Sequence, residues 1–164
     1  MASRAESFAT QAASDLAAYD VLCASSLPTC HRLHYLQMWL EKLCKAYLWL
    51  PGGTEDLRML HNVVAKVLPR MISEHWRRIG FRERPNISAI REICREIDLL
   101  HPQVDDDGRR PDNVEYPWVA VSGDVVAPAD SPARFPVTAR LHTHTGKLLL
   151  KAAIALTRDP TIFV

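Results

Sequence analysis

A cluster of arginines interleaved with aromatic side chains is the feature most suggestive of chemistry in the sequence. Its members stand close together in the chain and could contact a polyanion: Trp76, Arg77, Arg78, Phe81, Arg82 and Arg84. Arginine binds phosphate through planar, bidentate hydrogen bonds, and an aromatic ring can stack on a base. The cluster therefore predicts a nucleic-acid or phosphate site. The alternative is an ordinary exposed helix end, where cations favour the negative end of the helix dipole.

A second candidate site consists of three polar residues at helical spacing, His34, Gln37 and Glu41. Residues three and four apart share one face of a helix. These side chains could therefore meet in a polar groove. The alternative is a solvated helix face.

The sequence predicts no metal site and no cofactor. His142 and His144 alternate as two ligands on an extended segment would, but no carboxylate or cysteine stands close enough in sequence to complete a set. The cysteines are scattered, and no Cys-x-x-Cys pair occurs among Cys23, Cys30, Cys44 and Cys94. We expect reduced thiols, which are typical of a cytoplasmic protein.

One long amphipathic helix over residues 33–50 must position the second candidate site. Apolar residues recur there at steps of three and four: Leu33, Leu36, Leu40, Leu43, Tyr47 and Leu50. This spacing places them on one face of a helix. His34, Gln37, Glu41, Lys42 and Lys45 lie on the opposite side.

The remaining pattern predicts an all-α fold. Including the long helix, the expected helices cover residues 3–26, 33–50, 54–79, 87–101 and 138–157. Thr54 and Asn86 are suitable N-caps, and Pro69 should kink or split the third helix. Residues 119–126 look like a short β-hairpin across Ser122-Gly123, with an irregular excursion as the alternative. We expect a single domain over 1–164: an up-and-down bundle of about five helices, with 109–135 as a loop or hairpin excursion.

Bulk composition narrows the class of protein. The 164 residues are 48% hydrophobic, which is enough to build a core. Twenty basic and nineteen acidic residues nearly cancel, so a wholly cationic nucleic-acid-binding surface is excluded, although a local patch is not. The sequence has no apolar run of membrane-spanning length and no secretory signal. We expect a cytoplasmic protein without membrane contact.

A short signature within 33–50 points to a family. Its residues are His34-Tyr35, Gln37-Met38, Glu41-Lys42 and Lys45-Ala46. The pattern resembles the second helix of HEPN-type domains, where His-Tyr-x-Gln-Met followed by Glu-Lys-x-x-Lys-Ala recurs, and residues 110–118 resemble a segment of uncharacterised bacterial members. The resemblance implies a compact helical homodimer. Many members are metal-independent ribonucleases in toxin–antitoxin or phage-defence systems, and others are binding modules without catalysis.

The resemblance also implies a catalytic motif. Active members of the family carry an arginine that is followed, after four to six residues, by a histidine. Two pairs fit, Arg70 with His75 and Arg95 with His101. Histidine would serve as general acid or base, and arginine would hold the phosphate. Fifteen arginines and seven histidines in random order give about two such pairs. Residues five apart also lie about 140° apart around a helix, so His75 could simply line the core.

The sequence thus supports three hypotheses. The leading one is a HEPN-like dimer that binds nucleic acid or a nucleotide, as in a defence or toxin–antitoxin system. The second is a metal-independent endoribonuclease that uses one of the Arg/His pairs. The third is a structural subunit that binds a protein partner such as an antitoxin.

Overall fold

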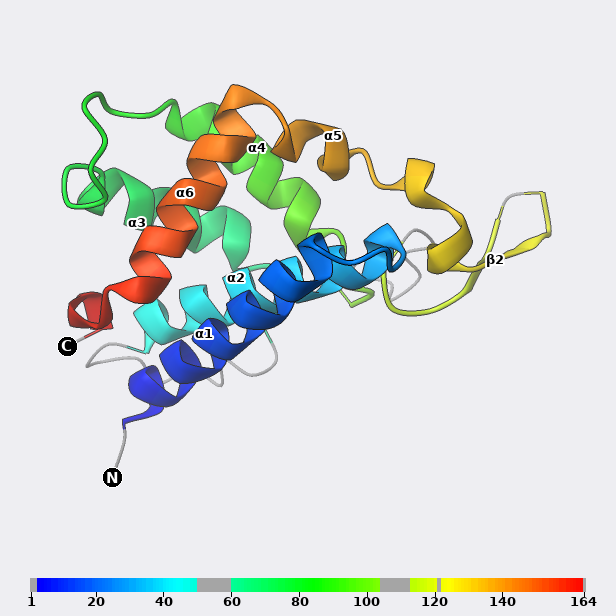
Figure 1. Ribbon diagram of the computed structural model, residues 1–164, viewed down its shortest axis with the longest axis horizontal. Coiled ribbons are helices and arrows are strands. Elements are labelled where there is room, and N and C mark those ends of the chain that lie inside the picture. The colour runs from blue at the N-terminus through cyan, green and yellow to red at the C-terminus, as the bar shows by residue number, and fades with distance from the viewer. Residues whose placement is uncertain (1–2, 50–59, 104–112, 121, 164) are drawn as a thin grey trace.

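Two long helices lie side by side along one edge of the molecule in the computed structural model, which describes residues 3–49, 60–103, 113–120 and 122–163 (Figure 1). Helix α1 spans Arg4–Cys23, and α2 spans Thr29–Leu48. Ser3 caps α1 through a capping box with Glu6, which satisfies two backbone amides at the helix start. Both helices agree with the predicted ones to within a few residues.

A second layer consists of α3 (Val64–His75), α4 (Ile87–Asp98) and α6 (His144–Arg158). The predicted N-cap at Asn86 is confirmed, since its Oδ1 accepts a hydrogen bond from the Ala89 amide. Helix α3 runs through Pro69 without being split. The predicted cap at Thr54 lies outside the described residues.

The start of α3 is capped by α4 rather than by its own segment. Asp98, at the end of α4, accepts hydrogen bonds from the Val64 amide at 3.0 Å and the Ala65 amide at 2.9 Å. Free amides at a helix N-terminus need such acceptors, and a carboxylate also suits the positive end of the dipole. This contact fixes the end of α4 against the start of α3.

A two-stranded hairpin interrupts the helices. Strand β1 (Trp118–Val119) pairs antiparallel with β2 (Val125–Val126), and Trp118 is opposite Val126. Gly123 has φ +89° in the turn, a conformation that favours glycine. The hairpin extends away from the helices at one end of the molecule (Figure 1). Two 3-10 turns, η2 (Pro128–Asp130) and η3 (Pro132–Arg134), lead back to the helices.

The single last helix predicted over 138–157 is wrong, because the structure has two. Helix α5 covers Val137–Leu141 and is followed by α6, with a final 3-10 turn, η4, at Pro160–Phe163. Thr143 starts α6 anew, since its Oγ1 accepts a hydrogen bond from the Gly146 amide. Gly146 allows the close approach of the two helices: a Cβ there would lie 2.2 Å from the Arg140 carbonyl oxygen.

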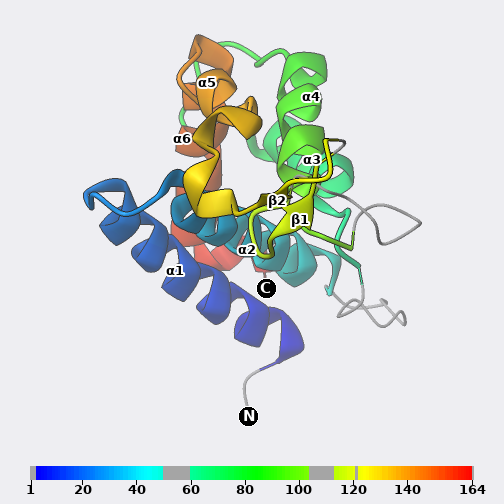
Figure 2. The same ribbon diagram turned by 90° about the vertical axis from the view of Figure 1, so that its right-hand side faces the viewer.

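The core forms around α2, which packs against α1 on one side and against α3 and α4 on the other, while α6 contacts α1, α3 and α4 (Figures 1 and 2). Its leucine stripe is fully buried, and Trp39 donates a hydrogen bond to Thr157 of α6 at 2.8 Å. The predicted all-α bundle with a short hairpin is confirmed. Within the described ranges, no helix has the length and apolar character needed to cross a membrane.

Candidate functional site

The polar side of α2 is buried, so it is not a solvated helix face. Gln37, Glu41 and Lys45 are 1%, 6% and 3% exposed. Successive positions four apart bring them into one line, with Glu41 in the middle. Glu41 Oε2 accepts from Gln37 Nε2 at 2.6 Å, and Glu41 Oε1 accepts from Lys45 Nζ at 2.6 Å. The carboxylate is therefore held from both sides along the helix.

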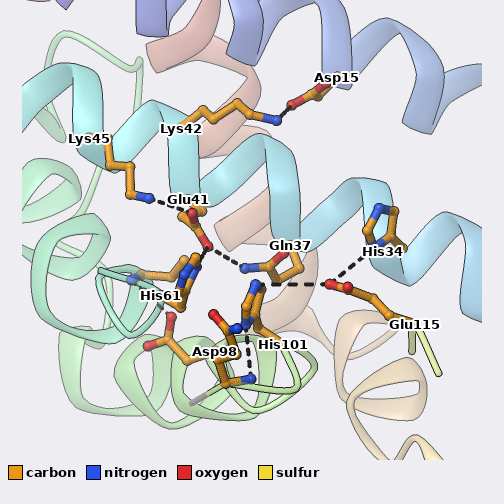
Figure 3. Close-up of polar contacts among 12 residues, drawn as sticks. Asp15, His34, Gln37, Glu41, Lys42, Lys45, His61, Asp98, His101 and Glu115 are labelled. Atoms are coloured by element: carbon orange, nitrogen blue, oxygen red, sulfur yellow. Dashed lines mark hydrogen bonds and ion pairs between the residues drawn. The ribbon is translucent and has the colours of Figure 1, made fainter. Parts of the chain in front are cut away.

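Two histidines from outside α2 face this line (Figure 3). The rings of His61 and His101 stack, with centroids 3.9 Å apart and planes within 9° of parallel. His61 Nδ1 lies 3.4 Å from Glu41 Oε2. His101 Nδ1 accepts a hydrogen bond from the Gln103 amide at 3.1 Å, so a neutral His101 ring carries its proton on Nε2.

Glu115 closes the other end of the cluster. Its Oε1 lies 3.9 Å from His101 Nε2 and 3.6 Å from His34 Nδ1. Asn113 holds the backbone around Glu115, because its Oδ1 accepts from the amides of Glu115 and Tyr116. We refer to Gln37, Glu41, Lys45, His61, His101, His34 and Glu115 together as the polar cluster.

Two buried atoms of the polar cluster have no hydrogen-bond partner in the described part of the chain. They are Gln37 Oε1 and His34 Nδ1. Most buried polar atoms in folded proteins are hydrogen-bonded, because an unpaired one costs about 1–3 kcal/mol. The cluster therefore has unused capacity to accept or donate hydrogen bonds.

Burial shifts the acidity of groups at the end of α4. The pKa of His101 falls to about 4, because burial and the neighbouring His61 disfavour the imidazolium form. The pKa of Asp98 rises to about 7, because burial outweighs the two α3 amides that favour its charged form. His101 is therefore neutral at physiological pH.

A pocket of about 630 Å³ lies beside the cluster, between the start of α3 and the outer face of α4. It is lined by Asn62, Ala65, Lys66, Arg91, Arg95, Asp98 and Leu99. Three of these side chains are cationic. The carboxylate of Asp98 is engaged by the α3 amides. The pocket is thus predominantly positive.

The members of the two predicted Arg/His pairs make different contacts in the structure. Arg70 is exposed and forms an ion pair with Glu74, while His75 lies edge-on to Tyr47. Arg95 pairs with Glu92 at the surface and lines the cationic pocket, whereas the nearby His101 belongs to the polar cluster.

The predicted arginine cluster is divided among different contacts. Arg77 lies over the Trp76 ring at 5.1 Å, and Arg78 donates two hydrogen bonds to Asp159 at 2.6 and 2.9 Å. Arg84 donates to Ser73, and together with Arg82 it lines a hollow of about 510 Å³ next to α6. Arg78 is thus engaged in holding the α6 end, which leaves Arg77 and Arg82 available to a ligand.

Gln37 and Glu41 are hydrogen-bonded to each other, and His34 lies at the other end of the polar cluster against Glu115, whereas sequence reasoning missed their partners. His61, Asp98 and Glu115 stand far from α2 in sequence and carry no local motif. Lys45 was expected on a polar outer face, but it is buried against Glu41. One feature of the sequence does indicate that other segments cover this face. The helix over residues 33–50 has an apolar face wide enough to pack against more than one neighbour, and charged residues flank that face.

The polar cluster also contains a set of metal-ligand types. One donor atom each from Glu41, His61 and His101 lies within 4.8 Å of the other two. His142 and His144 are exposed and do not belong to this set. Comparisons of the chain with protein-family models, curated proteins and solved structures find no match. The site must therefore be interpreted from its own geometry.

Proposed function

We propose that this protein binds RNA or a nucleotide through the cationic pocket between α3 and α4. The observation that carries the proposal is the convergence of Lys66, Arg91 and Arg95 on one cavity of about 630 Å³. Small-ligand sites commonly measure about 300–1,000 Å³. Arginine side chains in such a site bind phosphate by bidentate hydrogen bonds.

Three cations face one acid in the pocket lining. Asp98 is the one acid in the pocket lining, it is hydrogen-bonded to backbone amides, and burial raises its pKa to about 7, so it offsets only part of the three positive charges. Arg95 pairs with Glu92, but both side chains are more than half exposed, and exposed ion pairs contribute only about 0–1 kcal/mol. A phosphate can therefore replace Glu92 as the partner of Arg95 at low cost. A HEPN-like fold and homodimerisation belong to the same proposal and rest on the signature in α2.

Endoribonuclease activity is a second candidate function, favoured by the state of His101. Its pKa of about 4 leaves the ring neutral at physiological pH, and Nδ1 could accept a proton once the hydrogen bond from the Gln103 amide opens. Arg95 stands six residues earlier and lines the pocket, where it could hold the scissile phosphate. In this interpretation the pocket binds the substrate, and His101 transfers the proton.

Binding can be tested with fluorescently labelled single-stranded RNA and with a labelled nucleotide, measured by anisotropy over a salt series. We expect the Arg91→Ala, Arg95→Ala double variant to weaken binding at least about tenfold and to reduce the salt slope by about two. The matched control is Arg77→Ala, Arg82→Ala, which removes two arginines from the other basic surface. A loss in the control instead would assign binding to the 76–84 cluster and overturn the proposal.

Catalysis is tested separately by incubating RNA with the protein in EDTA. Cleavage that is absent from His101→Gln but retained in His75→Gln would establish the ribonuclease. Binding without cleavage would support the binding module. Absence of both binding and cleavage would contradict both proposals and favour the structural class.

A further inference from the structure

We infer that Glu41, His61 and His101 form a binding site for a divalent transition-metal ion such as Zn²⁺, inside the polar cluster. Two imidazoles and one carboxylate are a donor set that such ions take in proteins, with the fourth position left to water. The site does not depend on the proposed RNA-binding function.

The distances suit an ion of this size. Zinc ligands stand about 2.0–2.1 Å from the metal, so two donors of a tetrahedron are about 3.3–3.4 Å apart. His61 Nδ1 and Glu41 Oε2 are separated by 3.4 Å. This distance is long for a hydrogen bond but matches the edge of that tetrahedron. The His101 donor lies within 4.8 Å of both, so the third ligand is close at hand.

The charge around the three donors favours a cation. Glu41 and Glu115 bring two carboxylates to the polar cluster, and Lys45 is the ammonium bonded to Glu41. Glu41 Oε1 is held by Lys45, which leaves Oε2 directed toward His61. A divalent ion offsets the excess negative charge in a place where water screens it poorly.

The unpartnered oxygen of Gln37 supplies an independent indication of a missing ligand. Gln37 is 1% exposed, and its Oε1 has no partner among the described residues. The other end of the same amide donates to Glu41 Oε2, so the amide lies against a proposed metal ligand (Figure 3). A water on the ion would donate a hydrogen bond to Gln37 Oε1 and satisfy it. Such hydrogen-bonded neighbours orient the ligands of most metal sites.

Metal binding requires the histidine stack to open. An ion lies in the plane of each imidazole that binds it, and two parallel rings 3.9 Å apart share no such point. At least one ring must therefore turn. Both histidines stand outside the helices, His61 before α3 and His101 after α4, so their side chains can turn without disturbing helical backbone. This turning of a ring should change the NMR signals of the two histidines when the metal binds.

The test is titration of EDTA-treated, dialysed full-length protein with Co²⁺, followed by visible absorption, with Zn²⁺ competition and metal content by mass spectrometry. We expect one ion per chain, absorption bands of tetrahedral Co²⁺, and displaced histidine ring signals in NMR spectra. His61→Gln and His101→Gln should each weaken binding at least about tenfold. The exposed pair His142→Gln, His144→Gln is the matched control and should bind as the unmodified chain does.

Folding of each variant is checked by circular dichroism, because Glu41→Gln disturbs a buried ion pair and can destabilise the chain. If Glu41→Gln does not fold, the two histidine variants still measure the loss of metal binding. A stoichiometry near zero, or binding lost in the His142/His144 variant and kept in His61→Gln, would overturn it. Since no RNA is present, failure here is distinguishable from failure of the proposed RNA binding.

Discussion

His61 and His101 stack face to face, with ring centroids 3.9 Å apart and planes within 9° of parallel. Each ring also faces a carboxylate, Glu41 for His61 and Glu115 for His101. Stacking suits neutral rings, because two imidazolium ions at this distance would repel each other strongly. The stack joins the start of α3 to the end of α4, and Glu41 connects it to α2.

The buried pair of Glu41 and Lys45 should be strongly coupled. Lys45→Met removes the ammonium and leaves Glu41 as an unpaired buried charge, which typically costs about 3–5 kcal/mol. The double variant Glu41→Gln, Lys45→Met should recover at least about half of that loss. Urea unfolding of both single variants and the double variant measures the coupling. Additive losses would show that the pair does not act as a unit.

Stability should depend on pH through His101 and Asp98 in opposite directions. The folded pKa of His101 is lowered from 6.5 to about 4, so its contribution is present above pH 6.5 and is lost as pH falls toward 4. The folded pKa of Asp98 is raised from 3.8 to about 7, so its contribution is present below pH 3.8 and is lost as pH rises toward 7. Between about pH 4 and pH 6.5, His101 makes the free energy of unfolding rise with pH, and Asp98 makes it fall.

Replacing His101 or Asp98 singly separates their two contributions to the pH dependence of stability. In EDTA, His101→Gln should become less stable by about 3 kcal/mol as pH rises through that window, and Asp98→Asn should become more stable by a similar amount. Around these groups stand Glu41 and Lys66 near Asp98, and His61, His34, Glu41 and Lys45 near His101. Urea midpoints across the pH range measure both effects. Parallel curves for the two variants would contradict the assignment.

Removal of the α3 cap should destabilise the helix that borders the pocket. Asp98→Ala leaves the Val64 and Ala65 amides without their acceptor, at a cost of about 1–2 kcal/mol near neutral pH. Amide hydrogen exchange should increase most in the first turn of α3. The control is Glu92→Ala, an exposed residue of the same helix, which should change stability by no more than about 0.5 kcal/mol. Unchanged exchange in α3 after loss of Asp98 would disprove the capping role.

Any side chain at position 146 should destabilise the corner between α5 and α6. Gly146→Ala places a Cβ 2.2 Å from the Arg140 carbonyl oxygen and 2.5 Å from the Leu141 Cα, both backbone atoms that cannot turn aside. We expect a loss of at least about 2 kcal/mol in the free energy of unfolding. Gly80→Ala is an instructive comparison, since it meets no atom and strains only a backbone at φ +89°. A smaller loss at Gly146 than at Gly80 would count against the close approach.

Local pattern alone determined most of the helices. The alternating steps of three and four in α2, the cap at Asn86 and the turn at Gly123 act within a few residues, so they do not depend on the rest of the fold. The same local rules failed at residues 138–157. The apolar spacing there continues across Thr143, and only the packed structure shows that Thr143 begins a new helix beside Gly146.

The candidate site depended on tertiary structure. The sequence placed His34, Gln37 and Glu41 on one helix face, but nothing local indicates whether water or another segment covers that face. These side chains are buried because the end of α4 and the segment before α3 pack onto α2, which brings His61, His101 and Asp98 to this side. These contacts join residues distant in the chain, and such contacts follow from packing rather than from local propensity. The sequence therefore determined the helix that carries the site, and the tertiary structure decided its partners, its burial and its charge.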